Sequence, residues 1–351
     1  MKDYLIVGAG LAGLAFAEVA LRHGKEIRIV DNGSQGASSV AAGLYNPVAI
    51  KRLKPIPKAH SLLDTMLQFY GNSVPAFLHP LPLLRKFHSY EEQNQWFEAA
   101  DSPALRNLLH DRLVRLDQIP IDAPFGYGEV RHTGYVDTKG FINSYREDLA
   151  QKGLYDRAGI DYSLISIETD ACHYEGEAYK QIVFAEGFGL RANPYFNHLP
   201  LNGTKGEILL IRAEGLHLKC IVNAGIFILP VGKDVYRVGA TYEHLDKTNV
   251  PTEAGRQELL EKLRSVLQCN FEVIGHEAGV RPTVRDRQPL LGRHPQWSRL
   301  AVINGLGTRG VLFAPSLAEA LFQHIEHETS LPMEWDIARF RRGLSHNGQK
   351  G

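Results

Sequence analysis

The sequence predicts an α/β protein (α+β overall) in which a domain built on parallel strands is interleaved with a mostly antiparallel second domain. Residues 4–7 form an apolar run that leads straight into a Gly-x-Gly-x-x-Gly turn, a pattern typical of a parallel strand followed by a helix. Residues 181–184 have the composition of a further buried parallel strand, far along the chain. Segments 206–211, 227–230 and 236–241 indicate antiparallel strands.

The chain has 351 residues, which is too long for one ordinary hydrophobic core, so we expect two domains. Because the parallel strands lie so far apart in the sequence, their domain must be interrupted and resumed. We assign residues 1–75, 139–198 and 275–351 to this domain, and residues 76–138 and 199–274 to the second one. Helices at about 59–71, 90–99 and 140–152 connect the pieces.

Composition narrows the classes of function. Lys and Arg together number 39, as do Asp and Glu, so the net charge is zero and gives no global field toward nucleic acid or an anionic membrane. No uncharged run approaches the roughly 18 residues of a membrane span, so we expect no membrane association. Cys172, Cys220 and Cys269 form no CxxC pair, which argues against disulfides and zinc and favours a reducing, cytoplasmic location. We predict no metal site.

The first glycine turn has a mechanical reason for each glycine. Gly8 permits the tight turn, Gly10 lets the backbone approach a pyrophosphate, and Gly13 lets helix and strand pack closely. The helix expected over residues 14–23 offers N–H groups and a positive dipole end to phosphates at its N-terminus, and we expect Leu11 and Ala12 of the preceding turn to contact the cofactor as well. Asp31 ends the second strand, where a carboxylate can accept hydrogen bonds from a ribose. The pattern predicts a Rossmann-like dinucleotide-binding unit, without separating FAD from NAD.

The loop after Asp31 is rich in small residues and contains two hydroxyls. Ser38 and Ser39 can donate hydrogen bonds to phosphate or ribityl oxygens of a long ligand that runs along residues 36–47. The alternative interpretation is a flexible Ser/Ala/Gly loop with no ligand.

A second glycine turn, at residues 305–310, follows a predicted strand at 300–304 and precedes a helix from about Pro315 to His324. Residues 328–335 show no further strand that ends in an acid, as a second nucleotide-binding unit would require. We therefore interpret this turn as one that brings N–H groups and a helix N-terminus against a ligand already held by the first unit.

Arg281 is a candidate substrate-binding residue. Pro282 restricts the backbone beside it, and a guanidinium held in this way suits bidentate capture of a carboxylate. The alternative is an arginine in a surface salt bridge.

Taken together, these motifs resemble the D-amino-acid oxidase superfamily of flavoenzymes, and most closely the bacterial glycine oxidases. The resemblance runs nearly end to end, through the turn at 8–13, Asp31 and segments 38–43, 134–137, 185–187, 205–207, 228–230, 239–241, 278–282, 291–295 and 314–315. It implies a doubly wound FAD-binding domain, with a mostly antiparallel substrate domain that covers the flavin, and non-covalent FAD. Besides the residues named above, it implies cofactor contacts for Ala42, Gly43, Leu44, Leu164 (at the adenine), Ala185, Gly187, Gly307, Thr308, Arg309, Gly310, Val311 and Leu312.

The resemblance also implies a function: FAD-dependent oxidation of a carboxylate-bearing amine, either a small amino acid or an N-substituted glycine. Hydride passes to flavin N5, the imine hydrolyses, and oxygen or another electron acceptor reoxidises the flavin. Arg281 would anchor the substrate carboxylate. Phe227 stands where glycine oxidases have a carboxylate-binding tyrosine, so we expect it to form an apolar pocket wall for a substrate larger than glycine.

Two alternatives stay open. The second glycine turn looks like that of the FAD domain in the bifunctional enzymes that modify tRNA, so the same chemistry could act on 5-carboxymethylaminomethyl-uridine in tRNA. A local basic surface made by Lys51, Arg52, Lys54 and Lys58 would serve that substrate, or it is simply a solvated loop edge. The other alternative is a flavin-containing binding protein without turnover. The sequence leaves the oligomeric state open, a homo-oligomer included.

Overall fold

The computed structural model describes residues 1–343 of the chain and divides it into two compact units. The first unit comprises Met1–Ser39, Lys139–Thr204 and the segment that begins at Val280, and the second comprises Val40–Thr138 and Lys205–Gly279. The expected boundary at residue 75 lies inside the second unit, because β3 (Leu44–Tyr45) pairs there with β9 (Gly134–Val136). Residues 344–351, which the sequence assigns to the parallel-strand domain, lie outside the described residues.

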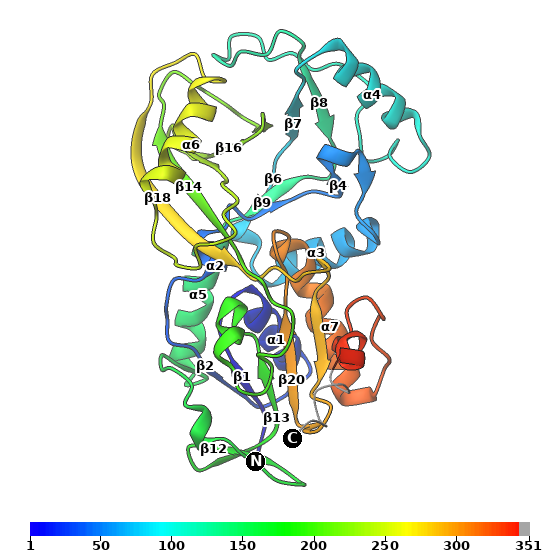
Figure 1. Cartoon of the computed structure of the whole chain (residues 1–351), viewed down its shortest axis with the longest axis vertical. Coiled ribbons are helices and arrows are strands. Elements are labelled where there is room, and N and C mark those ends of the chain that lie inside the picture. Colours follow the sequence, from blue (N-terminus) through cyan, green and yellow to red (C-terminus); the bar gives the residue numbers. More distant parts are fainter. Residues whose placement is uncertain (344–351) are drawn as a thin grey trace, which may run out of the picture. The chain divides into compact units, whose positions relative to one another are not determined.

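The first unit is built on a parallel sheet, as expected. The strands β10 (Tyr155–Asp156), β2 (Ile27–Val30), β1 (Lys2–Val7), β13 (Glu177–Phe184) and β20 (Leu300–Asn304) lie side by side and parallel (Figure 1). Their apolar residues form a continuous core that includes Leu5, Ile182 and Val302. Antiparallel strands are added around this sheet: β19 (Leu290–Arg293) on β20, and β12 (Cys172–Tyr174) with β11 (Ser166–Ile167) on the start of β13.

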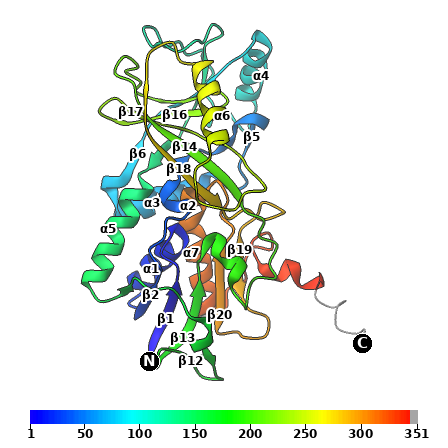
Figure 2. The ribbon, with the colours of Figure 1, turned by 60° about the vertical axis from the view of Figure 1, so that its left-hand side comes forward.

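Helices of the first unit pack on this sheet. The helix α1 (Leu11–Arg22) joins β1 to β2, and α7 (Gly310–His327) follows β20 and packs against α1 (Figures 1 and 2). The helix α7 begins earlier than the expected Pro315, which lies inside it and costs the hydrogen bond to the Val311 carbonyl. The remaining helical segments are α2 (Ala37–Val40), α5 (Thr138–Gln151), η3 (Tyr162–Leu164), η4 (Gly187–Ala192) and η5 (Ile337–Gly343).

The second unit contains a seven-stranded sheet in the order β18-β14-β17-β16-β15-β7-β8. Neighbouring strands are antiparallel from β14 to β15 and between β7 and β8, whereas β15 and β7 are parallel. The three predicted antiparallel strands are therefore confirmed as β14, β16 and β17. The strand bounds are β18 (Glu272–Arg281), β14 (Thr204–Arg212), β17 (Val235–Gly239), β16 (Phe227–Gly232), β15 (Ile221–Asn223), β7 (Leu83–Lys86) and β8 (Tyr127–Val130).

Helices and two smaller sheets complete the second unit. Leu259, Leu260 and Leu263 of α6 (Glu253–Arg264) join the core of the large sheet. Trp96 of α4 (Tyr90–Asp101) joins a second core with residues of β7 and β8. The other elements are β4 (Val48–Ala49), η1 (Ile50–Arg52), β5 (Lys54–Pro55), α3 (Ala59–Ser73), η2 (Pro75–Phe77) and β6 (Leu78–Pro80). No helix among the described residues is long and apolar enough to cross a bilayer.

A network of buried charges lies beside the large sheet of the second unit. The Lys205 side chain is fully buried and pairs with Asp246, with its ammonium 3.7 Å from Glu207 Oε1. Glu207 accepts hydrogen bonds from the backbone N–H and hydroxyl of Thr252, the N-cap of α6, and its Oε2 lies 2.8 Å from His276 Nε2. One buried carboxylate thus links three elements, and neutralising it would remove one of the two carboxylates beside a fully buried ammonium.

We therefore expect Glu207→Gln to destabilise the protein by about 3 kcal/mol, because removing one partner of a buried ion pair costs far more than removing an exposed one. The matched control is Glu272→Gln in the same sheet. Glu272 pairs with Arg212 at 3.4 Å, but its side chain is 69% exposed, so its loss should cost below about 1 kcal/mol. Urea unfolding followed by circular dichroism measures both. Equal midpoints for the two variants would contradict the role given to Glu207.

Candidate functional site

The candidate site of the first unit lies at the edge of its sheet where the parallel strands end. The strands β1, β2, β13 and β20 end at Val7, Val30, Phe184 and Asn304. Because these strands are parallel, the loops that follow them leave the same edge, which is where ligands bind in open α/β sheets.

The first glycine turn is as crowded as the sequence predicts. Gly8 has a φ of +102°, and a Cβ there would lie 2.6 Å from the Ala185 carbonyl oxygen. A Cβ on Gly13 would lie 1.9 Å from the Gly8 carbonyl oxygen. A Cβ on Gly10 would meet Ser38, at 3.1 Å from its Oγ. Gly8 and Gly13 therefore permit close contact between loop, helix and the next strand, while Gly10 keeps the helix entrance open.

The N-terminus of α1 is capped from the next loop. Gly10, the N-cap, provides no side chain, and the N–H of Leu11 donates to Ser38 Oγ at 3.2 Å. By helix geometry the N–H groups of Ala12 and Gly13 have no acceptor within the helix, so they can serve a phosphate. Ser39 uses its hydroxyl locally, donating to the Gly36 carbonyl at 2.9 Å. Of the two serines, Ser38 is thus the one placed at the helix entrance.

Asp31 is tied into the turn from two sides. Its Oδ2 accepts from the Ala9 N–H at 2.9 Å and its Oδ1 from the Gly33 N–H at 2.8 Å. Arg146 of α5 places Nη2 3.1 Å from Asp31 Oδ1 and donates through Nε to the Ala9 carbonyl. No local pattern of the sequence indicates Arg146, because its partner is more than a hundred positions away. Contact of Asp31 with a ribose stays a prediction.

The loop after β13 carries Glu186, a partly buried carboxyl group for which the sequence predicted no role. Glu186 accepts hydrogen bonds from the Tyr162 hydroxyl and from Asn193 Nδ2, the latter at 2.7 Å. Burial raises the pKa of the Glu186 carboxyl, and the two hydrogen bonds offset this shift only in part. Glu186 ties η3, which contains the half-exposed Leu164, to the loop that holds Ala185 and Gly187.

The second glycine turn lies beside this loop and beside the start of α1. Asn304 donates through Nδ2 to the Gly187 carbonyl at 2.9 Å, and a Cβ on Gly310 would lie 3.1 Å from Leu11 Cδ1. Two helix N-termini, those of α1 and α7, therefore meet at one edge of the sheet. Val311 and Leu312 are buried in the core, so only their backbone can face a ligand, while Arg309 is the N-cap and Thr308 precedes it.

Arg281 ends β18 and is followed by a tightly held backbone. The Gly307 N–H donates to the Pro282 carbonyl at 3.1 Å, so the segment lies against the second glycine turn. The Asn202 N–H donates to the Thr283 carbonyl at 2.8 Å, and the Thr283 and Thr204 hydroxyls lie 2.9 Å apart. These contacts fix the main chain from which the Arg281 side chain extends.

Four of the predicted residues belong to the second unit. Gly43 has a φ of +71°, and a Cβ there would lie 1.8 Å from the Val136 carbonyl oxygen, so Ala42, Gly43 and Leu44 form a fixed turn against β9. The Phe227 ring lies over Gly239 of the neighbouring strand, where a Cβ would come within 2.9 Å of the ring. Gly239 therefore makes room for the ring. Cofactor and substrate contacts of these residues stay predictions.

The first-unit residues fit a dinucleotide. The turn has no side chain at Gly10, two helix N-termini face the same edge, and Asp31 stands at the end of β2. A pyrophosphate is favoured at such helix ends because unpaired N–H groups and the helix dipoles both attract its charge. The fold and this edge are those of a dinucleotide-binding protein of the α/β class.

The comparison with protein families identifies the family to which the chain belongs. Residues 3–324 match the model of the DAO family, FAD dependent oxidoreductases, and the chain belongs to this family. The protein is therefore an FAD-dependent enzyme, as the sequence predicted.

Similar proteins include enzymes with different substrates. The chain is 22% identical to a glycine oxidase of Bacillus licheniformis, covering 91% of each chain. It is 24% identical to the tRNA 5-methylaminomethyl-2-thiouridine biosynthesis bifunctional protein MnmC of Idiomarina loihiensis. That alignment covers 96% of this chain but only 58% of the relative. Among solved structures, iminodiacetate oxidase from Chelativorans sp. BNC1 superposes with a TM-score of 0.75 at 21% identity, over 95% of this chain and 98% of that one.

The close approach at Gly13 makes a sharp prediction. Gly13→Ala should lower FAD content and destabilise the protein by about 2–3 kcal/mol, because the added methyl collides with the Gly8 carbonyl. Gly71→Ala is the matched control, since Gly71 also lies in a helix but has no described atom within 4 Å of an added Cβ. It should be neutral or slightly stabilising. Flavin absorbance per protein and a melting curve check both variants, and normal FAD content in Gly13→Ala would contradict the geometry.

Proposed function

We propose that this enzyme oxidises an amine that carries a carboxylate, either a small amino acid or an N-substituted glycine. The observation that carries the proposal is the position of Arg281, whose backbone is held against the second glycine turn through the hydrogen bond from Gly307 to Pro282. A guanidinium on a fixed main chain can bind a carboxylate through two parallel hydrogen bonds. That geometry orients the substrate as well as binding it.

Bound FAD supplies an acceptor for the hydride that leaves the α-carbon. The residues of this chain bind the cofactor and orient the substrate. The glycine turn at Gly8 and the N-terminus of α1 hold the dinucleotide, and the N-terminus of α7 offers a partial positive charge at the second turn. Arg281 fixes the carboxylate, and with it the direction of the α-C–H bond. Since orientation supplies most of the rate, no acid–base pair is required for the hydride to leave.

Phe227 bears on the size of the substrate. A phenyl ring cannot donate the hydrogen bond that a tyrosine hydroxyl would give a carboxylate, a loss worth roughly 1.5–3 kcal/mol for a charged acceptor. The ring instead offers an apolar surface, which we propose as a wall of the substrate pocket. This favours a substrate larger than glycine. The likeness to an iminodiacetate oxidase supports the N-substituted glycines in particular.

Anaerobic reduction of the flavin tests the proposal directly. We expect the FAD-loaded enzyme to be bleached by at least one of iminodiacetate, sarcosine, D-proline or another D-amino acid, and more slowly by glycine. Absorbance after rapid mixing measures the rate for each amine. Glycine as the best substrate would contradict the role of Phe227. No bleaching by any amine of the panel would favour a flavin-containing binding protein instead.

Variants of Arg281 test the anchor itself. Arg281→Ala should slow flavin reduction by carboxylated amines about a hundredfold or more, with FAD content and melting temperature unchanged. Arg281→Lys keeps the charge but loses the two-pronged geometry, so the limiting rate should fall along with affinity. Arg212→Ala, at an exposed arginine of the other unit, is the matched control. A melting temperature that falls while the reduction rate stays normal would mark Arg281 as structural.

A second candidate function is the same oxidation on a carboxymethylaminomethyl-uridine of tRNA. The likeness to MnmC supports it, as does a basic hairpin of the second unit. Lys51 and Arg52 lie in η1 at the tip of the β4–β5 hairpin, and Lys54 lies in β5; all three are exposed, as is Lys58 just beyond. Four exposed cations within eight positions can contact a phosphate backbone.

Salt dependence of tRNA binding tests this candidate. If the hairpin binds phosphates, Lys51→Gln/Arg52→Gln should weaken binding of bulk tRNA and reduce the slope of log K against log salt by about 1.4–1.8, because two cations no longer neutralise phosphates. Lys152→Gln/Arg22→Gln removes two exposed charges of the first unit and serves as the control. Binding that is absent at low salt, or equal in both double variants, would exclude the hairpin as a tRNA site.

A further inference from the structure

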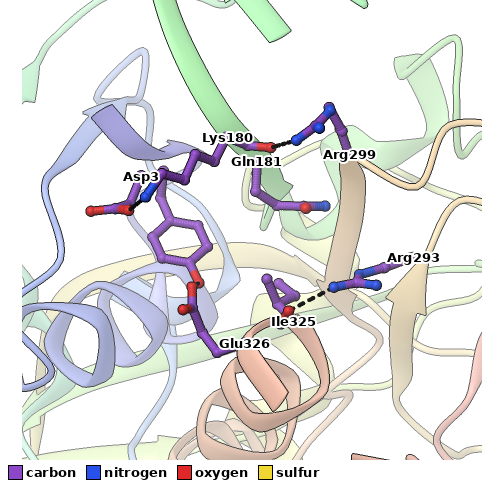
Figure 3. A pocket seen from close by; sticks show the side chains of 8 residues that line it. Asp3, Lys180, Gln181, Arg293, Arg299, Ile325 and Glu326 are labelled. Atoms are coloured by element: carbon purple, nitrogen blue, oxygen red, sulfur yellow. Dashed lines mark hydrogen bonds and ion pairs between the residues drawn. The ribbon is translucent and has the colours of Figure 1, made fainter. Parts of the chain in front are cut away.

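A cavity of the first unit lies at the edge of the sheet opposite the dinucleotide edge, where β1 and β20 begin. It has a volume of about 240 Å³ and lies between the start of β1, the middle of β13, the end of β19 and the C-terminal turn of α7 (Figure 3). Charged side chains dominate its lining: Asp3, Lys180, Arg293, Arg299 and Glu326. The dinucleotide site uses none of them.

Each carboxylate of this cavity already has its own cation. Asp3 Oδ1 lies 2.7 Å from Lys180 Nζ, and Asp3 Oδ2 accepts from the Glu26 N–H at 2.9 Å. Glu326 pairs with Lys25 and accepts a hydrogen bond from the buried Tyr4 hydroxyl. Burial opposes ionisation of Asp3 and Glu326, but these partners outweigh it and lower both pKa values. Both carboxylates are therefore ionised and neutralised near pH 7.

The two guanidinium groups are held by carbonyl oxygens instead. Arg299 donates to the carbonyls of Thr169 at 2.8 Å and Lys180 at 3.1 Å. Arg293 donates to the Ile325 carbonyl at 2.7 Å, and its Nε is buried without a hydrogen-bond partner in residues 1–343. Among the residues that the structure describes, neither arginine forms an ion pair with a carboxylate. Figure 3 shows both side chains at the cavity, on the side opposite Asp3.

We propose that this cavity is a binding site for a small oxyanion, a carboxylate or a phosphate. Arg293 Nη1 and Arg299 Nη2 have no hydrogen-bond acceptor among the described residues. Guanidinium N–H groups of this kind bind oxyanions through charge-assisted hydrogen bonds. The volume of about 240 Å³ is enough for inorganic phosphate or a short dicarboxylate.

Calorimetric titration of the FAD-loaded full chain tests the site, with inorganic phosphate and succinate as separate probes at low salt. We expect one of them, or both, to bind with one site per chain. Affinity should fall at least about tenfold in Arg299→Gln and in Arg293→Gln, since each removes a charge-assisted hydrogen bond. Arg212→Gln, which alters an arginine already paired with Glu272, should bind normally. If one of the two arginine variants fails to fold, the affinity of the other variant tests the proposal.

Three outcomes would overturn the proposal. Neither probe binding at concentrations up to about 10 mM would exclude a site of useful affinity. Unchanged affinity in the arginine variants that fold would place the anion elsewhere. Binding that survives in these variants but disappears in Arg281→Ala would assign the anion to the proposed substrate site. Phosphate binding without succinate binding, or the reverse, supports the site and identifies which of the two oxyanions it prefers.

Discussion

The contact on which the rest of the first unit depends is the approach of α1 to the loop after β1. A Cβ on Gly13 would come within 1.9 Å of the Gly8 carbonyl oxygen, so helix and strand can lie this close only when residue 13 has no side chain. A Cβ on Gly8 would likewise come within 2.6 Å of the Ala185 carbonyl oxygen, so the absence of a side chain at residue 8 lets the loop after β13 lie close to this turn. The absence of side chains at residues 8 and 13 thus determines how closely α1, β1 and the loop after β13 approach one another at the dinucleotide edge.

Electrostatics at that edge follows from the same packing. Gly310 of α7 lies against Leu11 of α1, so two helix N-termini concentrate partial positive charge at this edge. Asp31 adds a carboxylate at this edge, but Arg146 and two backbone N–H groups balance it. The edge therefore remains favourable for an anionic cofactor although it contains an acid.

The two ends of one parallel sheet are thus suited to different ligands. At the carboxyl end, backbone N–H groups and glycines present a surface with few side chains, which suits a long dinucleotide. At the amino end, Arg293 and Arg299 project into a compact cavity, where specificity would come from guanidinium groups. Since β1, β13 and α7 contribute to both ends, the same elements position both sites.

The sequence by itself determined the local features: the glycine turns and the strand and helix types. The FAD-dependent class followed from the resemblance of these motifs, taken in their order along the chain, to a known family. Turn conformation and hydrophobic period depend on neighbouring residues, so they can be read along the chain. Only the tertiary structure paired Arg146 with Asp31, Asn304 with Gly187 and residues 44–45 with β9, and it alone brought Arg293 and Arg299 to one cavity. Such pairings join residues far apart in the sequence, and chain topology brings them together, with no trace in any local pattern.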